Sequence, residues 1–195
     1  MKKADFDLFK IENSIVPKQG RVLVSGPFLH DIYFSKSVVL IVEHNDDGTI
    51  GFVINKPVTL NVKEILKDFP DFNADISLGG PVNTNTIQFI HNVGNIIPKS
   101  IKILENLYWG GDFDALKDLI NDGIVNNTNI KFFIGYSGWT PNQLNEEIKE
   151  NSWLVTELSN NELMKRNDNV WSDTLSNLGE KYKIWTNFPE NPSFN

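Results

Sequence analysis

The chain has 195 residues, of which 40% are hydrophobic and 22% are charged, and it contains 13 Gly, 9 Pro and no Cys. This composition is typical of a globular domain and excludes collagen-like, coiled-coil and wholly disordered chains. The absence of cysteine excludes disulfides, zinc–thiolate sites, iron–sulfur clusters and thiol nucleophiles. A net charge of −7 argues against direct nucleic-acid binding, because nucleic-acid-binding proteins usually present a basic face.

The first predicted elements are three strands, at residues 21–25, 37–43 and 50–55. The second and third flank an Asn-Asp-Asp-Gly sequence at 45–48, and Asp and Gly tolerate the positive φ that a tight turn requires. We therefore expect these two strands to form a β-hairpin.

A short amphipathic helix is predicted next, over residues 62–69. Asn61 and Glu64 stand three residues apart, the spacing of a capping box, which satisfies the first free N–H groups of a helix. The apolar residues of this segment recur at helical period and so share one face: Val62, Ile65, Leu66 and Phe69. Pro70 ends the helix.

In the middle of the chain, residues 76–78 and 86–91 are predicted strands on either side of a Gly-Gly-Pro turn at 79–81. A second helix is expected to start near Asp112. Gly123 ends it, because glycine readily adopts the left-handed conformation of a helix stop.

Residues 129–136 form the next predicted strand, which we expect to break at a Ser-Gly pair at 137–138. A third helix is then expected to begin at Thr140. Pro141 suits its first turn, and Gln143 completes a Thr-x-x-Gln capping box.

The last predicted elements are a short strand opening at Trp153 and a helix over residues 171–178. Strands in hairpin-like groups thus alternate with helices, which predicts an α+β fold with a mixed or largely antiparallel sheet. We expect a single domain over residues 1–195, with a polar lead-in at 1–18 and short helices and an irregular tail at 159–195.

The N-terminal segment carries Asp5, Asp7 and Glu12 where a signal peptide needs an unbroken apolar stretch. The longest purely apolar run covers residues 38–42, far short of the roughly 20 residues that a membrane-spanning helix needs. We therefore expect a cytoplasmic protein without a membrane partner.

The three histidines, His30, His44 and His91, are the first candidates for chemistry. His44 and His91 each end a predicted strand, and Glu43 precedes His44. Such a set could form a metal site or an acid–base pair, because imidazole binds transition metals and titrates near neutrality. No spacing fixes two metal ligands on one element, so the alternative is that each histidine caps a strand or bonds a backbone carbonyl. We expect no metal and no cofactor.

The sequence GYSGW at 135–139 invites comparison with the Gly-x-Ser-x-Gly nucleophile elbow. Trp139 occupies the place of the second glycine, and every histidine precedes Ser137, which argues against a serine hydrolase. The alternative is a tight strand-to-helix turn in which Gly138 supplies backbone freedom. In that interpretation, Gly138→Val should misfold the protein.

Several ordered segments carry a resemblance to a known family: GRVLVSGP at 20–27, FSKSVVLIVEHNDDGTIGFVINK at 34–56, LGGPV at 78–82, GYSGW at 135–139 and QLNEE at 143–147. Together they resemble the AlgH/YqgE family of bacterial proteins. The resemblance implies an α+β fold whose bent, partly barrel-like sheet is surrounded by helices. It carries an old association with transcriptional regulation of alginate synthesis, but no established activity, cofactor or catalytic residue.

Among the motif positions of this resemblance, His44, His91 and Gln143 are polar where a core would not require it. With Glu43 and Asn55 they form the candidate ligand-binding set, and they define a site if they converge in one cleft. We expect a binding or interaction protein rather than an enzyme, with an unidentified protein or small molecule as partner. Two alternatives stay open: an enzyme or small-ligand binder that uses these residues, and a transcriptional regulator, which the acidic charge and the lack of a helix-turn-helix disfavour.

Overall fold

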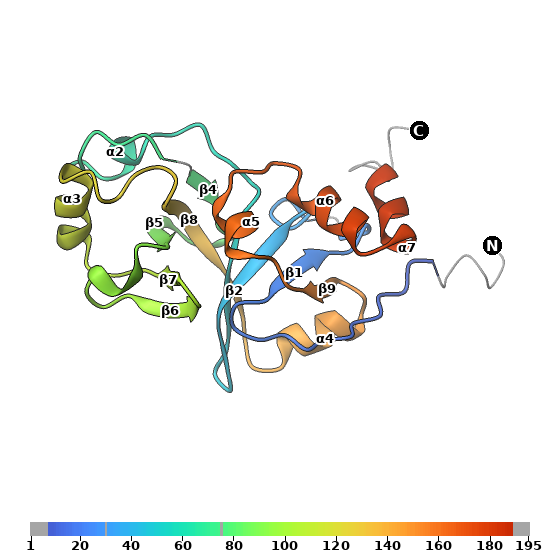
Figure 1. Cartoon of the computed structure of the whole chain (residues 1–195). Coiled ribbons are helices and arrows are strands. Elements are labelled where there is room, and N and C mark those ends of the chain that lie inside the picture. Colours follow the sequence, from blue (N-terminus) through green and yellow to red (C-terminus); the bar gives the residue numbers. More distant parts are fainter. Residues whose placement is uncertain (1–7, 30, 75, 189–195) are drawn as a thin grey trace.

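The computed structural model describes residues 8–29, 31–74 and 76–188 (Figure 1). The strands are β1 Val22–Ser25, β2 Val38–Asn45, β3 Gly48–Val53, β4 Ile76–Leu78, β5 Val82–His91, β6 Ile101–Leu104, β7 Leu107–Trp109, β8 Ile130–Trp139 and β9 Trp153–Thr156. The helices are α2 Val62–Ile65, α3 Phe113–Asn121, α4 Gln143–Lys149, α5 Asn160–Met164, α6 Val170–Asn177 and α7 Glu180–Lys183, with 3-10 turns at Gly94–Ile96 and Ile184–Asn187.

Within the described residues, the strands form one sheet with the order β6-β7-β5-β8-β3-β2-β1-β9, and β4 pairs with β8 beside that path. The pairing of β4 with β8 is parallel, and the other strand pairs are antiparallel. The α+β fold with a mixed, largely antiparallel sheet surrounded by helices is therefore confirmed. The sheet bends without closing into a barrel, since the edge strands β6 and β9 do not pair in the part of the chain described.

The continuous apolar run in β2 is explained by burial on both of its faces. Successive side chains of a strand point to opposite faces. Residues 38, 40 and 42 join the cluster that contains Trp171 of α6, whereas residues 39 and 41 pack with Leu144 of α4. Figure 1 shows the same arrangement, with α6 on one side of β1 and β2 and α4 on the other.

The bend of the sheet brings the edge strand β6 close to β2, although four strands lie between them in the sheet order. The Gln19 side chain bridges the two. Its Nε2 donates to the Val42 carbonyl at 3.0 Å and to the Lys102 carbonyl at 3.2 Å. This contact shows how the sheet curls around the core.

The hairpin expected around residues 45–48 is confirmed. β2 and β3 pair antiparallel, with His44 opposite Thr49 and Asn45 opposite Gly48, and the register shifts between Ile41 and Glu43. Figure 1 shows the hairpin reaching down beside the segment that leads into α4. The hairpin and that segment thus enclose one region of the surface.

Strand β8 links the two halves of the sheet, and it corrects two expectations. Instead of breaking at 137–138, the strand continues to Trp139: its first half pairs with β5 and β4, and its second half with β3. Gly138 lies in this strand without a positive φ, so the reason given for misfolding of Gly138→Val is wrong. The constrained glycine is Gly135, with φ 66°, where a Cβ would lie 2.7 Å from the Val82 carbonyl oxygen.

The capping box predicted at Asn61 and Glu64 is confirmed. The Asn61 side chain accepts from the Lys63 N–H at 2.9 Å, and Glu64 accepts from the Asn61 N–H at 3.1 Å, as a capping box requires. The helix they start is shorter than predicted, although Phe69 still packs in the same cluster as Val62.

The second predicted helix, α3, starts after Asp112, whose side chain accepts from the N–H groups of Asp114 and Ala115. Gly123 beyond its end has φ 72°, the expected left-handed stop. The third, α4, begins at Gln143 instead of Thr140 because Asn142 before it adopts a left-handed conformation with φ 67°. The prediction that Thr140 caps this helix in a Thr-x-x-Gln box is therefore wrong, although the Gln143 side chain does accept from the Thr140 N–H.

The N-terminal segment protects the open edge of β9. Asn13 Nδ2 donates to the Trp153 carbonyl at 3.1 Å, and Asn13 Oδ1 accepts from the Val155 N–H at 2.6 Å. The side-chain amide thus pairs with β9 as the backbone of a further strand would. Across the described ranges, no helix combines the length and the apolar character needed to cross a membrane.

Candidate functional site

The five candidate residues do not line one cavity. His44 lines a cavity of about 410 Å³ between the β2–β3 hairpin and the segment leading into α4. Asn55 lines a different cavity, of about 390 Å³. Glu43, His91 and Gln143 line neither. His30, the third histidine, lies outside the described residues.

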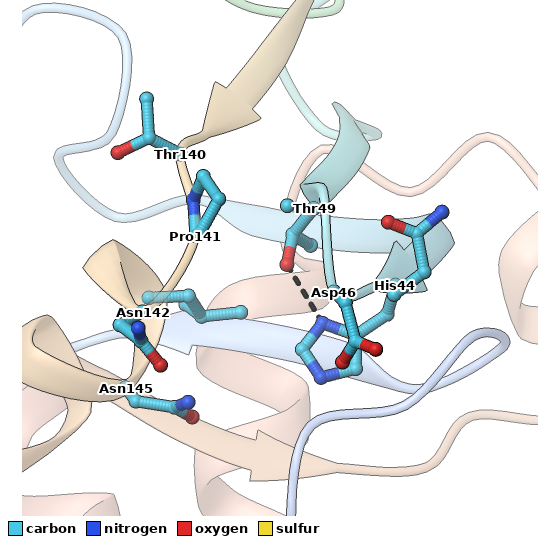
Figure 2. Close-up of a pocket in the computed structure, with 10 residues that line it drawn as sticks. His44, Asp46, Thr49, Thr140, Pro141, Asn142 and Asn145 are labelled. Carbon is cyan, nitrogen blue, oxygen red and sulfur yellow. Dashed lines mark hydrogen bonds between the residues drawn. The ribbon is translucent and has the colours of Figure 1, made fainter.

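The cavity at His44, which we call the hairpin pocket, has a largely polar wall (Figure 2). The hairpin contributes His44, Asp46 and Thr49, and the segment before and within α4 contributes Asn142 and Asn145. These side chains offer an imidazole, a carboxylate, a hydroxyl and two carboxamides. A ligand with hydrogen-bonding groups on several sides fits this chemistry.

His44 is half-buried, and one of its ring nitrogens is fixed. Its Nδ1 lies 2.7 Å from the Oγ1 of Thr49, the residue directly opposite His44 in the β2–β3 hairpin. In Figure 2 the ring lies between Asp46 and Asn145. Among the described residues, no group hydrogen bonds to the Nε2, so this nitrogen is available to a ligand as a donor or an acceptor.

Gln143 shapes the hairpin pocket without lining it. Its Oε1 accepts from the Thr140 N–H at 3.0 Å, and its Nε2 donates to the Glu147 Oε1 at 3.0 Å. The polarity that made Gln143 a candidate is thus used to hold the turn before α4. That turn carries Asn142 into the wall of the pocket.

Glu147 is a residue that the sequence analysis did not single out. Its Oε2 accepts from the indole N–H groups of Trp139 at 2.8 Å and Trp153 at 2.7 Å. Both indoles are buried, so this carboxylate fixes α4 against β8 and β9. The signal that could have found it is the i, i+4 spacing of Gln143 and Glu147.

Glu43 is next to His44 in the sequence but does not share its pocket. Its Oε1 accepts from the Asn45 Nδ2 at 3.2 Å. Neighbouring side chains of a strand point to opposite faces, which separates Glu43 from the imidazole. Glu43 therefore adds no direct contact to the hairpin pocket.

His91 is fully buried in β5 and stacks on Tyr108, with ring centroids 5.5 Å apart. Its Nε2 lies 2.9 Å from the Ser100 Oγ, which itself donates to the carbonyls of Ile97 and Gly110. The serine proton is thus used, so His91 Nε2 is the donor, and Nδ1 has no hydrogen-bond partner among the residues that the structure describes. Burial lowers the pKa of His91 to about 4.

Asn55 is also buried, and its side chain hydrogen bonds to the backbone at the end of the hairpin away from the turn. Its Oδ1 accepts from the Val38 N–H, and its Nδ2 donates to the Lys36 carbonyl, each at 2.9 Å. Lys36 and Lys56 line the same cavity as Asn55, and the sequence analysis missed both. Metal binding finds no support in the described part of the chain, which holds no group of three or more His, Cys, Asp or Glu arranged to bind an ion.

The comparisons with known proteins agree on one family. The family model described as AlgH-like matches residues 22–183. A UPF0301 protein of Parabacteroides distasonis is 46% identical over 193 residues, covering 97% of this chain and 98% of the relative. A UPF0301 protein of Bacteroides fragilis is 44% identical over 193 residues, covering 97% of each.

Two solved structures are similar to the whole fold. The solution structure of the AlgH protein from Pseudomonas aeruginosa matches with a TM-score of 0.69 at 28% identity, covering 90% of this chain and 97% of that one. A crystal structure of a protein from Corynebacterium diphtheriae matches with a TM-score of 0.76 at 20% identity, covering 91% and 95%. At that identity, the second likeness concerns the fold alone.

Proposed function

This chain belongs to the AlgH-like family, and we propose that it is a cytoplasmic binding protein that holds a small polar molecule in the hairpin pocket. The observation that carries the proposal is His44, whose Nδ1 is fixed by Thr49 at 2.7 Å while its Nε2 stays available. An imidazole held in one orientation loses little conformational freedom when a ligand binds. Such a residue at a polar cavity supports recognition of a specific hydrogen-bonding group.

Binding is favoured over bond cleavage by the position of the nearby hydroxyls. The hydroxyl in contact with the imidazole is that of Thr49, a residue that is only 5% exposed. A nucleophile must reach the reacting atom of a substrate, and Thr49, although it lines the pocket, has little exposed surface through which its hydroxyl could do so. The Thr140 hydroxyl is already paired with Gln143 at 3.2 Å. The arrangement therefore supports a recognition role for His44.

The test is a titration followed by thermal melting and by amide NMR signals. The panel holds nucleotides, amino acids, sugars and dicarboxylates, together with a short DNA duplex, because direct DNA regulation predicts a steep salt-dependent affinity. A ligand that binds only the folded state raises the melting temperature. We expect one class of polar small molecule to raise it and to shift the signals of Gly48 and Asn145 saturably.

His44→Ala should weaken that binding at least about tenfold, the effect of losing a hydrogen bond of ordinary strength. Asp118→Ala on α3 is the control, because Asp118 is exposed and lines none of the cavities described above. The proposal would be contradicted by a ligand that His44→Ala binds as tightly as the native protein. A panel without any saturable response at the hairpin would contradict it too.

A further inference from the structure

We propose a second ligand site, for the phosphoryl group of a small molecule, at the opposite end of the β2–β3 hairpin. The site is the cavity of about 390 Å³ lined by Lys36, Asn55, Lys56, Trp171, Ser172 and Thr186, which we call the lysine pocket; Asp168 and Asn169 complete its wall. This inference is independent of the hairpin pocket and of His44. It rests on the charge and the geometry of the cavity.

The hairpin register brings the two lysines together. Val39 of β2 pairs with Val53 of β3, and Lys36 and Lys56 each lie three residues further along their segments, away from the hairpin turn. Ile54 N–H also donates to the Val38 carbonyl at 3.0 Å, so the two segments stay paired beyond β3. Two lysines that are 20 residues apart in the chain thus line one cavity.

Among the described residues, no ion pair balances the charge of the two lysines. Both are half-buried, and neither forms an ion pair with a described residue. The carboxylate in the wall, Asp168, lies 3.6 Å from the Nε of Arg166 and is partly neutralised by it. Within the part of the chain that the structure describes, the cavity thus holds two lysines without an ion-pair partner, in a protein with a net charge of −7. An anion that displaces water there is stabilised by both.

Lys36 is held in place before any ligand arrives. It adopts a left-handed backbone conformation with φ 48°, and Asn55 Nδ2 donates to its carbonyl at 2.9 Å. Its ammonium lies 5.6 Å from the centre of the Trp171 ring, a cation–π contact, and the Trp171 Nε1 is fixed to the Ser25 carbonyl at 3.0 Å. Asn55 is thus a positioning residue for Lys36. This gives a function to a residue that the sequence analysis selected.

The two hydroxyls in the wall already donate to backbone carbonyls, so their protons are not available to a phosphoryl group. Ser172 Oγ donates to the Asn169 carbonyl, and Thr186 Oγ1 donates to the Lys183 carbonyl, each at 2.8–2.9 Å. Recognition therefore falls to the two ammonium groups, supplemented by the start of α6, where Asn169 provides no side-chain cap. A phosphomonoester carries a charge of about −1.5 to −2 at neutral pH, which matches two lysines, whereas one carboxylate leaves a lysine unpaired.

The experiment follows the indole N–H NMR signal of Trp171 while inorganic phosphate, pyrophosphate or acetate is added at constant ionic strength. We expect a saturable shift with phosphate and pyrophosphate, and a response at least about tenfold weaker with acetate. Lys36→Met and Lys56→Met should each weaken phosphate binding about tenfold or more. Lys18→Met removes the same charge from an exposed position outside the pocket and should leave the affinity within about twofold.

Three results would overturn the proposal: a shift that never saturates, equal responses to phosphate and acetate, or equal losses in Lys18→Met and Lys56→Met. A short DNA duplex is a further arm, and tighter binding of duplex than of pyrophosphate would reject a small-molecule site. Lys56→Met is the decisive variant, because within the described ranges no ion pair or ring contact involves Lys56, whereas Lys36 also packs on Trp171. His44→Ala should bind phosphate normally, which separates a failure here from a failure of the hairpin pocket.

Discussion

At the scale of single residues, His44 and His91 differ in exposure, although both stand near the end of a strand: His44 is the residue before the last in β2, and His91 is the last residue of β5. His44 faces the hairpin pocket, whereas His91 has no exposed surface and stacks on Tyr108. The local sequence does not distinguish them, because the exposure of each ring depends on which strand packs over it. For His91 that strand is β7, whose Tyr108 pairs with it.

The buried imidazole of His91 makes the stability of the protein depend on pH. Its pKa falls from 6.5 to about 4 on folding, because burial penalises the charged ring. The unfolded chain therefore binds more protons between these values, and stability that is present above pH 6.5 is lost as the pH falls towards 4. The shift corresponds to about 3 kcal/mol, since one pKa unit is about 1.4 kcal/mol.

Urea unfolding of the native protein at pH 7.0 and pH 4.5 measures this loss, and His91→Phe is the matched variant. Phenylalanine fills a similar space but cannot be protonated. We expect the decrease in unfolding free energy between the two pH values to be about 2–3 kcal/mol smaller in His91→Phe. An equal decrease in both proteins would show that His91 is not the group that titrates.

At the scale of elements, α4 depends on contacts outside its own sequence. It is only seven residues long, and its N-cap residue Asn142 makes no side-chain cap. Short helices in proteins are held mainly by packing and tertiary hydrogen bonds. For α4 these are the burial of Leu144 and the bonds from Trp139 and Trp153 to Glu147.

Glu147→Gln tests this anchoring. A carboxamide is neutral and offers one oxygen in place of the carboxylate, whose Oε2 now accepts from both indole N–H groups and whose Oε1 accepts from the Gln143 amide. We expect a loss of about 2 kcal/mol, because both buried indole donors lose a charged acceptor. Chemical denaturation measures the loss.

Glu146, the residue before Glu147, provides the control variant. Glu146 is exposed and pairs only with Lys149 at 2.7 Å among the described residues, so Glu146→Gln should change stability by less than about 0.5 kcal/mol. The anchoring role of Glu147 fails if both variants lose the same stability. The amide signals of Asn142 and Asn145 should move in Glu147→Gln alone, because α4 sets one wall of the hairpin pocket.

At the scale of the whole molecule, one strand joins the two halves of the sheet. β8 pairs with β4 before Gly135, with β5 on both sides of Gly135, and with β3 from Ser137 onward. At Gly135 the backbone of β8 lies so close to residues 80–84 that a Cβ atom has no room. We expect the bend of the sheet, and with it the position of the hairpin beside α4, to depend on this close approach.

Gly135→Ala should therefore destabilise the protein by more than about 2 kcal/mol. The left-handed backbone alone costs about 1–2 kcal/mol for a residue with a Cβ, and the close approach to the Val82 and Gly80 carbonyls adds to it. Gly138→Ala is the control, because its Cβ would meet the Tyr136 ring edge at 3.3 Å in ordinary extended backbone. Thermal and urea unfolding measure the stability of both variants. A larger loss of stability in Gly138→Ala would support the expectation from the sequence that Gly138 is the constrained glycine.

The sequence by itself determined the family and the elements that depend on neighbours in the chain. The hairpin turn at 45–48, the Asn61 cap, the helix start near Asp112 and the Gly123 stop were all predicted from residues within a few positions of each other. Hydrogen bonds and backbone conformations of this kind are local, so a single sequence contains their cause. The lengths and start points of the helices were predicted less well, because tertiary packing, and not the hydrophobic periodicity alone, decides where a short helix begins and ends.

Only the tertiary structure decided which polar residues meet. It separated His44 from His91, brought the buried indoles of β8 and β9 to Glu147, and placed Lys36 and Lys56 in the wall of one cavity. Each of these outcomes depends on strand register and on the bend of the sheet, which join segments far apart in the chain. No local pattern of residues encodes such distances, and the two pockets at the ends of one hairpin become visible only when the sheet is assembled.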